Sequence, residues 1–151
     1  MKKLLITICV SLITINLTVS QIVTIKDKNG NILNDTKYVH VDDNGVNTTD
    51  TIKLKTFLND TFSVNTDVKV TRFNVERCST SDNFYCWDIC YTPAMSSTPV
   101  HTSADGRSMV PGAEDNNFSA YHLSNGETGN ATYRFGFSIK GSTDTSFVDV
   151  E

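Results

Sequence analysis

Apolar and polar residues alternate with a period of two over most of the chain after residue 20. This alternation is typical of β-strands that bury one face, and no window of a dozen residues keeps apolar positions at the helical spacing of 3.6. Turn-forming residues recur about every ten positions, which favours an all-β, two-sheet immunoglobulin-like sandwich of roughly seven to nine strands. We expect strands near residues 21–25, 32–33, 38–41, 52–56, 62–75, 100, 133–139 and 147–150.

Three local patterns refine this expectation. In residues 133–139 large apolar side chains occupy every second position, so this strand should lie centrally against a facing sheet. In residues 62–75 the apolar parity changes between Val70 and Phe73, which predicts a β-bulge or bend near Arg72. The dipeptide Asn29-Gly30 lies between apolar runs and predicts a hairpin with a type I′ turn.

The first 20 residues have the organisation of a secretory signal peptide. Lys2 and Lys3 precede an apolar stretch that ends at Thr18-Val19-Ser20, which predicts cleavage before Gln21. The stretch is too short and too rich in Thr and Ser for a membrane anchor. Cys9 lies inside it, where a lipoprotein cysteine does not occur. We therefore expect residues 1–20 to be removed, leaving no membrane span, and a secreted or cell-surface product.

Composition bounds what the mature chain contacts. Removing 20 of the 151 residues leaves 131, a length that favours one β-sandwich domain over residues 21–151. Loss of Lys2 and Lys3 lowers the basic count from 13 to 11 against 17 acidic residues, which gives a formal charge of −6. Nucleic acids and anionic membranes select for clustered basic residues. We expect neither as a partner, because the basic residues here are scattered.

Three cysteines remain after cleavage, and an oxidising compartment favours one disulfide among them. A bridge between Cys86 and Cys90 requires the chain to turn within residues 87–89, because four residues of extended strand separate the Cα atoms too widely. We favour this bridge, while a bridge that uses Cys78 stays open. A redox role is disfavoured, since redox pairs use Cys-x-x-Cys at a helix start.

The segment Phe84-Tyr85-Cys86-Trp87-Asp88-Ile89-Cys90-Tyr91-Thr92-Pro93 resembles a motif, Phe-Cys-Trp-x-x-Cys-Tyr-x-Pro, of secreted β-sandwich domains in the Bacteroidetes phylum. Looser similarity extends from residue 27 to residue 135. The resemblance implies a secreted or surface location and a sandwich fold, and no defined activity. Those domains often precede a sorting region of the type IX secretion system, a region that we do not expect within residues 21–151. The triplet Asp50-Thr51-Ile52 resembles O-glycosylation acceptors of that phylum, which makes Thr51 a candidate modification site.

The sequence gives little support for a catalytic site or a metal site. A copper site would combine histidines with Cys90 and Met109, but their spacing is unlike that of blue-copper proteins. The histidines are His40, His101 and His122. A hydrolase would need a nucleophile, a base and an orienting group, and the chain has no Gly-x-Ser-x-Gly motif. We therefore expect no enzyme, no metal and no cofactor.

The leading hypothesis is a non-catalytic extracellular module that contacts a protein or a glycan, with Trp87, Tyr91 and Tyr121 as its binding surface. The alternative is a structural or assembly component of the cell surface, and a secreted enzyme or metal binder ranks third. The exposure of Trp87 separates the first two: a solvent-facing ring favours a binding surface, and a buried ring favours a scaffold.

Overall fold

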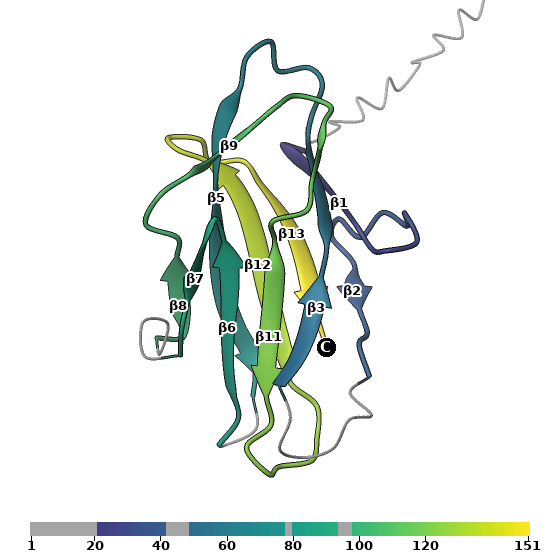
Figure 1. The fold of residues 1–151 in the computed structure, drawn as a ribbon, viewed down its shortest axis with the longest axis vertical. Coiled ribbons are helices and arrows are strands. Elements are labelled where there is room, and N and C mark those ends of the chain that lie inside the picture. Colours follow the sequence, from purple (N-terminus) through teal and green to yellow (C-terminus); the bar gives the residue numbers. More distant parts are fainter. Residues whose placement is uncertain (1–20, 42–48, 78–79, 94–97) are drawn as a thin grey trace, which may run out of the picture.

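The computed structural model describes residues 21–41, 49–77, 80–93 and 98–151, and these form thirteen β-strands (Figure 1). The longer strands are β3 (Thr49–Lys53), β5 (Thr66–Glu76), β6 (Asp82–Trp87), β11 (Ser119–Leu123), β12 (Thr132–Ile139) and β13 (Thr145–Val150). The shorter strands are β1 (Val23–Lys26), β2 (Lys37–Tyr38), β4 (Lys55–Leu58), β7 (Ile89–Tyr91), β8 (Val100–Thr102), β9 (Arg107–Met109) and β10 (Glu114–Asp115). The predicted secretory signal and Cys78 lie outside the described residues.

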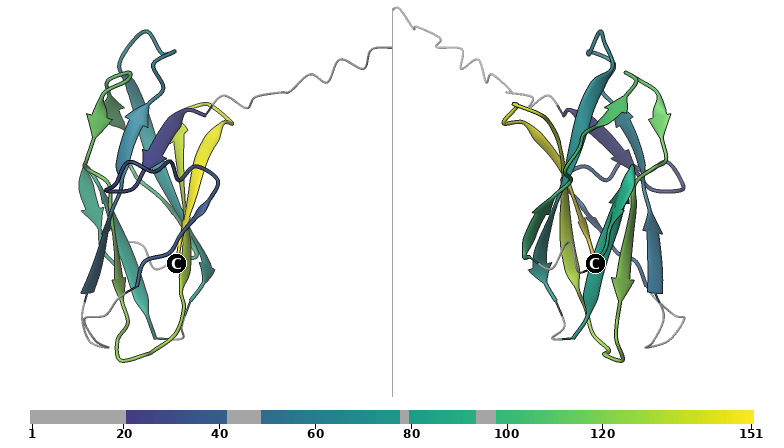
Figure 2. Two further views of the ribbon diagram at one scale, coloured as in Figure 1. Left: turned by 90° about the vertical axis from the view of Figure 1, so that its right-hand side faces the viewer. Right: turned by 60° about the vertical axis from the view of Figure 1, so that its left-hand side comes forward.

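The strands form two packed layers (Figure 2). One layer has the order β2-β13-β12-β5-β8, and β9 pairs with the other end of β5. The facing layer has the order β3-β11-β6-β7 and is continued by the sheet β1-β4-β10, because β3 runs into β4 past Leu54. The predicted all-β sandwich is confirmed. The strand number exceeds the expected seven to nine because several short pairings do not stand out as separate apolar runs.

The core lies between the layers and is built around β12, which is central in its layer, as predicted, with β13 and β5 on its two sides. Tyr133, Phe135 and Phe137 point inward and are buried, whereas Arg134 is exposed. Phe118 packs edge-on against Phe135 and Phe137, with ring centroids 5.0 Å and 5.2 Å apart. Edge-to-face packing at these distances is favourable for aromatic rings.

Strand β5 corrects the prediction of a bulge near Arg72. Its inward parity continues through Val68, Val70 and Arg72, and Arg72 is fully buried opposite Phe135. Phe73 lies on the outer face, where its ring is 6.3 Å from that of Phe147. The irregular register lies later in the strand, where Thr132 pairs with Glu76 and Tyr133 with Asn74. The parity switch therefore reflects a buried arginine and a half-buried aromatic ring on the outer face.

The turns also differ in part from expectation. Residues 27–30 do form a hairpin turn, in which the Gly30 N–H donates to the Asp27 carbonyl at 3.1 Å. Only Gly30 has a positive φ there, so the turn is not type I′. Asn125 and Gly126 have φ values of 50° and 87°, the combination that a type I′ turn requires.

Side chains form hydrogen bonds with the backbone N–H and C=O groups along one edge of β1. The Asn34 side chain donates to the Val23 carbonyl at 2.6 Å and accepts from the Ile25 N–H at 2.8 Å. Ser146 Oγ accepts from the Val23 N–H at 3.0 Å. These contacts protect an edge that would otherwise offer unpaired donors and acceptors.

Within the residues that the structure describes, no helix is long and apolar enough to cross a bilayer.

Candidate ligand-binding pocket

The cysteine motif forms a tight hairpin. A disulfide joins Cys86 in β6 to Cys90 in β7, the pairing that the sequence favours, with the Cα atoms 3.9 Å apart. The chain turns within residues 87–89, where Asp88 has a φ of 68°. Arg107 Nη1 donates to the Asp88 carboxylate at 2.6 Å, which ties the tip of the hairpin to β9. The motif therefore fixes a local turn.

The expected binding surface is wrong at two of its three residues. Trp87 is only 1 % exposed, and its Nε1 donates to the Val68 carbonyl at 2.7 Å. Tyr91 is 2 % exposed, and its hydroxyl accepts from the Ala104 N–H at 3.0 Å. Both rings belong to the core because the hairpin aims them inward between the sheets.

Tyr121 lies apart from these rings. It is half-buried and stacks on its cross-strand neighbour Phe84, with centroids 4.3 Å apart and ring planes within 4°. Thr51 is exposed on β3 and pairs with Tyr121 across the sheet. The candidate modification site is thus accessible, and its modification stays a prediction.

The three histidines do not gather at one place. His101 Nδ1 lies 2.9 Å from the Tyr85 hydroxyl, and burial together with the positive charge of Arg72 lowers the pKa of its imidazole. His40 and His122 line a pocket that His101 does not touch. Met109 is buried in the core. No three His, Cys, Asp or Glu side chains of the described residues are placed to hold a metal ion.

The pocket opens at the end of the sandwich that carries the β11–β12 connection (Figure 1) and has a volume of about 330 Å³. We call it the end pocket. Strands of both layers contribute to it, together with the segment after β2. Its lining comprises Val39, His40, Val41, Asp50, Ile52, Ser81, His122, Ser124, Glu127, Thr128, Gly129, Asn130, Ala131, Tyr133, Val150 and Glu151.

One wall is built by the segment after β2 and the start of β3. His40 Nε2 contacts an Asp50 carboxylate oxygen at 2.5 Å, and the other carboxylate oxygen accepts from the Thr51 N–H at 2.8 Å. The His40 N–H donates to the Glu151 carbonyl at 2.6 Å, and the Glu151 N–H donates to the Tyr38 carbonyl at 2.9 Å. These bonds extend the parallel pairing of β2 with β13 and hold the imidazole in place.

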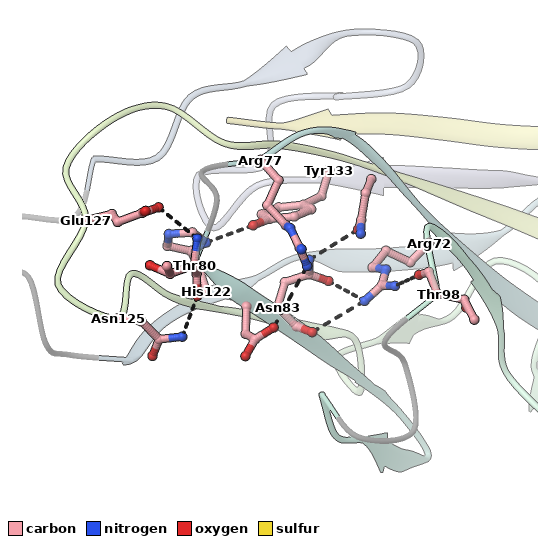
Figure 3. A network of polar contacts seen from close by, with 11 residues as sticks. Arg72, Arg77, Thr80, Asn83, Thr98, His122, Asn125, Glu127 and Tyr133 are labelled. Carbon is pink, nitrogen blue, oxygen red and sulfur yellow. Dashed lines mark hydrogen bonds and ion pairs between the residues drawn. The ribbon is translucent and has the colours of Figure 1, made fainter.

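The opposite wall is built by β11, β12 and their connection (Figure 3). His122 Nδ1 lies 3.0 Å from the hydroxyl of Tyr133, so the two layers are bridged at the pocket. The type I′ turn at 125–126 brings Glu127 back toward Thr80, whose N–H donates to the Glu127 carboxylate at 3.1 Å. Asn125 Nδ2 donates to the Thr80 carbonyl at 2.8 Å, which fixes the connection from its other side.

The lining combines apolar walls with a few polar groups, as small-ligand pockets commonly do. The apolar side chains are Val39, Val41, Ile52, Ala131 and Val150, and the carboxylates are Asp50, Glu127 and Glu151. The lining that the structure describes includes no lysine or arginine. The arrangement therefore suits the enclosure of a small neutral or positively charged group.

Sequence reasoning named His40 and His122 only as possible metal ligands and placed Asp50 only in the O-glycosylation triplet. Their meeting at one pocket depends on pairing between distant segments, which periodicity does not reveal. The one available signal is that His40 and Asp50 lie on either side of the polar, turn-forming segment Asp42-Asp43-Asn44-Gly45.

No protein-family model matches the sequence, and no curated protein is significantly similar to it. Among solved structures, the chain is similar to one described as "Structure of the N-terminal domain of PorA", with a TM-score of 0.47 and 15 % sequence identity. The similarity covers 85 % of this chain and 92 % of that chain.

Proposed function

We propose that residues 21–151 form a non-catalytic extracellular binding module whose ligand site is the end pocket. The observation that carries the proposal is a pocket of about 330 Å³ that combines apolar walls with polar groups. Hydrogen bonds of the fold fix two of its walls, through His122 and Tyr133 on one side and through the backbone of His40 and Glu151 on the other. A largely preformed pocket of this size and mixed lining is the common form of a ligand site. Trp87 and Tyr91, by contrast, are buried in the core and offer no surface to a ligand.

Three features support an extracellular location. Residues 1–20 have the charge and apolar pattern of a signal peptide. The disulfide between Cys86 and Cys90 is stable in oxidising compartments. The motif around that disulfide resembles secreted domains of Bacteroidetes, some of which use type IX secretion. The partner is a protein or a glycan, because the charge of −6 expected after cleavage disfavours nucleic acids and anionic membranes.

A pair of matched substitutions tests the site. Val39→Trp fills the mouth of the end pocket, whereas Val64→Trp makes the same change at an exposed valine in the β4–β5 connection, at the other end of the sandwich (Figure 1). Partners of the wild-type protein are first defined on a glycan array and by pull-down. We expect Val64→Trp to retain them and Val39→Trp to lose them. Equal retention by both variants would show that the end pocket is not the site.

The alternative, a structural or assembly component of the surface, draws support from the burial of Trp87 and Tyr91. It also draws support from the outer face of the layer that contains β5 and β13, where Phe73 packs on Phe147 and Val75 and Val100 are exposed. On this reading Val39→Trp changes nothing. Replacement of Val100 by serine would instead weaken assembly, measured as surface retention of the protein.

A further inference from the structure

Building on the proposed function, we propose that the end pocket takes a basic side chain, arginine or lysine, from a partner polypeptide. The proposal identifies the chemical class of the ligand that the proposed function leaves open. It rests on the charge of the lining, on the apolar walls and on the exposed rim of the pocket.

The charge of the lining favours a cation. Asp50, Glu127 and Glu151 contribute carboxylates, and no lysine or arginine belongs to the described lining. Basic groups temper this charge: His40 contacts Asp50, His122 also belongs to the lining, and Lys37, which stands outside the lining, pairs with Glu151. An anionic ligand is disfavoured, because the described lining contributes three carboxylates and no guanidinium or ammonium group of its own. A guanidinium or ammonium group, by contrast, donates charge-assisted hydrogen bonds to carboxylates.

The apolar walls fit the rest of such a side chain. Arginine and lysine carry a long methylene stem that packs on apolar surface while the charged head reaches polar groups. In the end pocket Val39, Ile52 and Val150 supply apolar wall beside the carboxylates. A ligand that is only charged, or only apolar, would leave part of this lining without a matching group.

The same lining disfavours a sugar. Saccharides are commonly held on an exposed aromatic face, because the apolar face of the ring stacks there. Tyr133 is an aromatic side chain of the lining, but it is 4 % exposed and its hydroxyl contacts His122. At the rim, Val39 and Val41 are 60 % and 77 % exposed. These side chains would be covered by the residues on either side of an inserted basic residue, which favours a polypeptide over an isolated amine.

The first test compares two peptides that differ in charge alone. The probes are the acetylated, amidated pentapeptide Gly-Ala-Arg-Ala-Gly and the same peptide with citrulline, the neutral isostere of arginine. Titration calorimetry with the purified protein should give saturable binding of the arginine peptide. We expect about tenfold weaker binding of the citrulline peptide, since one charge-assisted contact is lost. Raised salt should reduce the difference.

Substitutions at Val39 supply the matched controls. Val39→Lys and Val39→Glu add side chains of opposite charge at an exposed position of the rim, where folding is unaffected. The lysine variant should bind the arginine peptide more weakly than wild type, and the glutamate variant more tightly. The citrulline peptide should respond to neither. Glu127→Gln should weaken arginine binding while the Thr80 contact is retained through the amide oxygen.

The possible outcomes separate this inference from the proposed function. If a neutral peptide or a saccharide binds as tightly as the arginine peptide and Val39→Trp blocks it, the end pocket is a ligand site but the basic class is wrong. If the arginine peptide does not bind saturably, or binds equally to the lysine and glutamate variants, the inference is overturned. If, in addition, no partner responds to Val39→Trp, the proposed function also fails.

Discussion

Arg72 shows how one residue can defeat a pattern. It occupies an inward position of β5, where alternation predicts an apolar side chain. Its Nη1 donates to Asn83 Oδ1 at 2.5 Å and its Nη2 donates to the Thr98 carbonyl at 2.6 Å (Figure 3). Burial lowers the pKa of the guanidinium below its usual value. Alternation predicts that an arginine is exposed, because the pattern of apolar and polar residues does not reveal the hydrogen-bond acceptors that permit its burial.

Asn34 should be among the most sensitive polar residues of the fold. Asn34→Ala leaves the buried Val23 carbonyl and Ile25 N–H without the partners they have now. Each unsatisfied buried group costs about 1 to 3 kcal/mol. We expect a loss of about 2 to 4 kcal/mol in the free energy of unfolding, measured by denaturant titration. Asn31→Ala, an exposed change in the same hairpin, should cost less, and equal losses would contradict the assigned role.

His101 should make stability depend on pH. Burial, followed by the charge of Arg72, lowers the pKa of its imidazole in the folded state. The unfolded chain therefore takes up the proton first, and the free energy of unfolding should fall as pH drops below about 6.5. The loss should level off below the folded pKa. Denaturant midpoints between pH 7 and pH 5 should fall less in His101→Gln than in wild type. A parallel fall in both proteins would exclude His101 as the cause.

At the scale of elements, the best-predicted strand is β12. Its alternation is confirmed because both of its faces are set by local sequence: large apolar residues alternate with Arg134, Gly136 and Ser138. The presence of glycine at position 136 has a further reason, which the alternation does not reveal. A Cβ there would lie 2.8 Å from the Phe147 ring, so the glycine leaves room for the aromatic side chain of its neighbour on β13.

Substitutions on β12 should reproduce its two faces. Phe135→Ala empties a buried aromatic site and should cost about 3 to 5 kcal/mol of the free energy of unfolding. Arg134→Ala removes an exposed ion pair with Asp149 and should cost under about 1 kcal/mol. Denaturant midpoints compare the two. Similar losses would mean that the inward face is misassigned.

The β6–β7 hairpin makes a prediction about the disulfide. Its closed loop is very short, so loop closure gives the Cys86–Cys90 bridge about 2 kcal/mol of stabilisation. Peptide mapping without reduction should find both cysteines in one short cross-linked peptide and an alkylatable thiol at Cys78. A peptide that links Cys78 to either partner would exclude this pairing.

At the scale of the whole molecule, the features that the sequence predicts are those formed by residues close together along the chain. The sandwich, the central strand and the turn of the cysteine motif were predictable, because each follows from residues within a dozen positions of one another. The end pocket was not, because it combines residues 39–41, 50–52, 122–133 and 150–151 from both layers. The sequence favours Trp87, Tyr91 and Tyr121 as the site because aromatic residues suit binding, yet tertiary packing uses Trp87 and Tyr91 for the core.

The chain contains internal reporters that distinguish the end pocket from the aromatic motif. It has three histidines and one tryptophan. His40 and His122 line the end pocket, whereas His101 packs on Tyr85 and Trp87 is buried. The most direct measurement is therefore an NMR titration of the imidazole and indole resonances with the arginine pentapeptide. We predict shifts at His40 and His122 with little change at His101 and Trp87. Shifts centred on Trp87 or His101, with His40 and His122 unmoved, would contradict a ligand site at the end pocket.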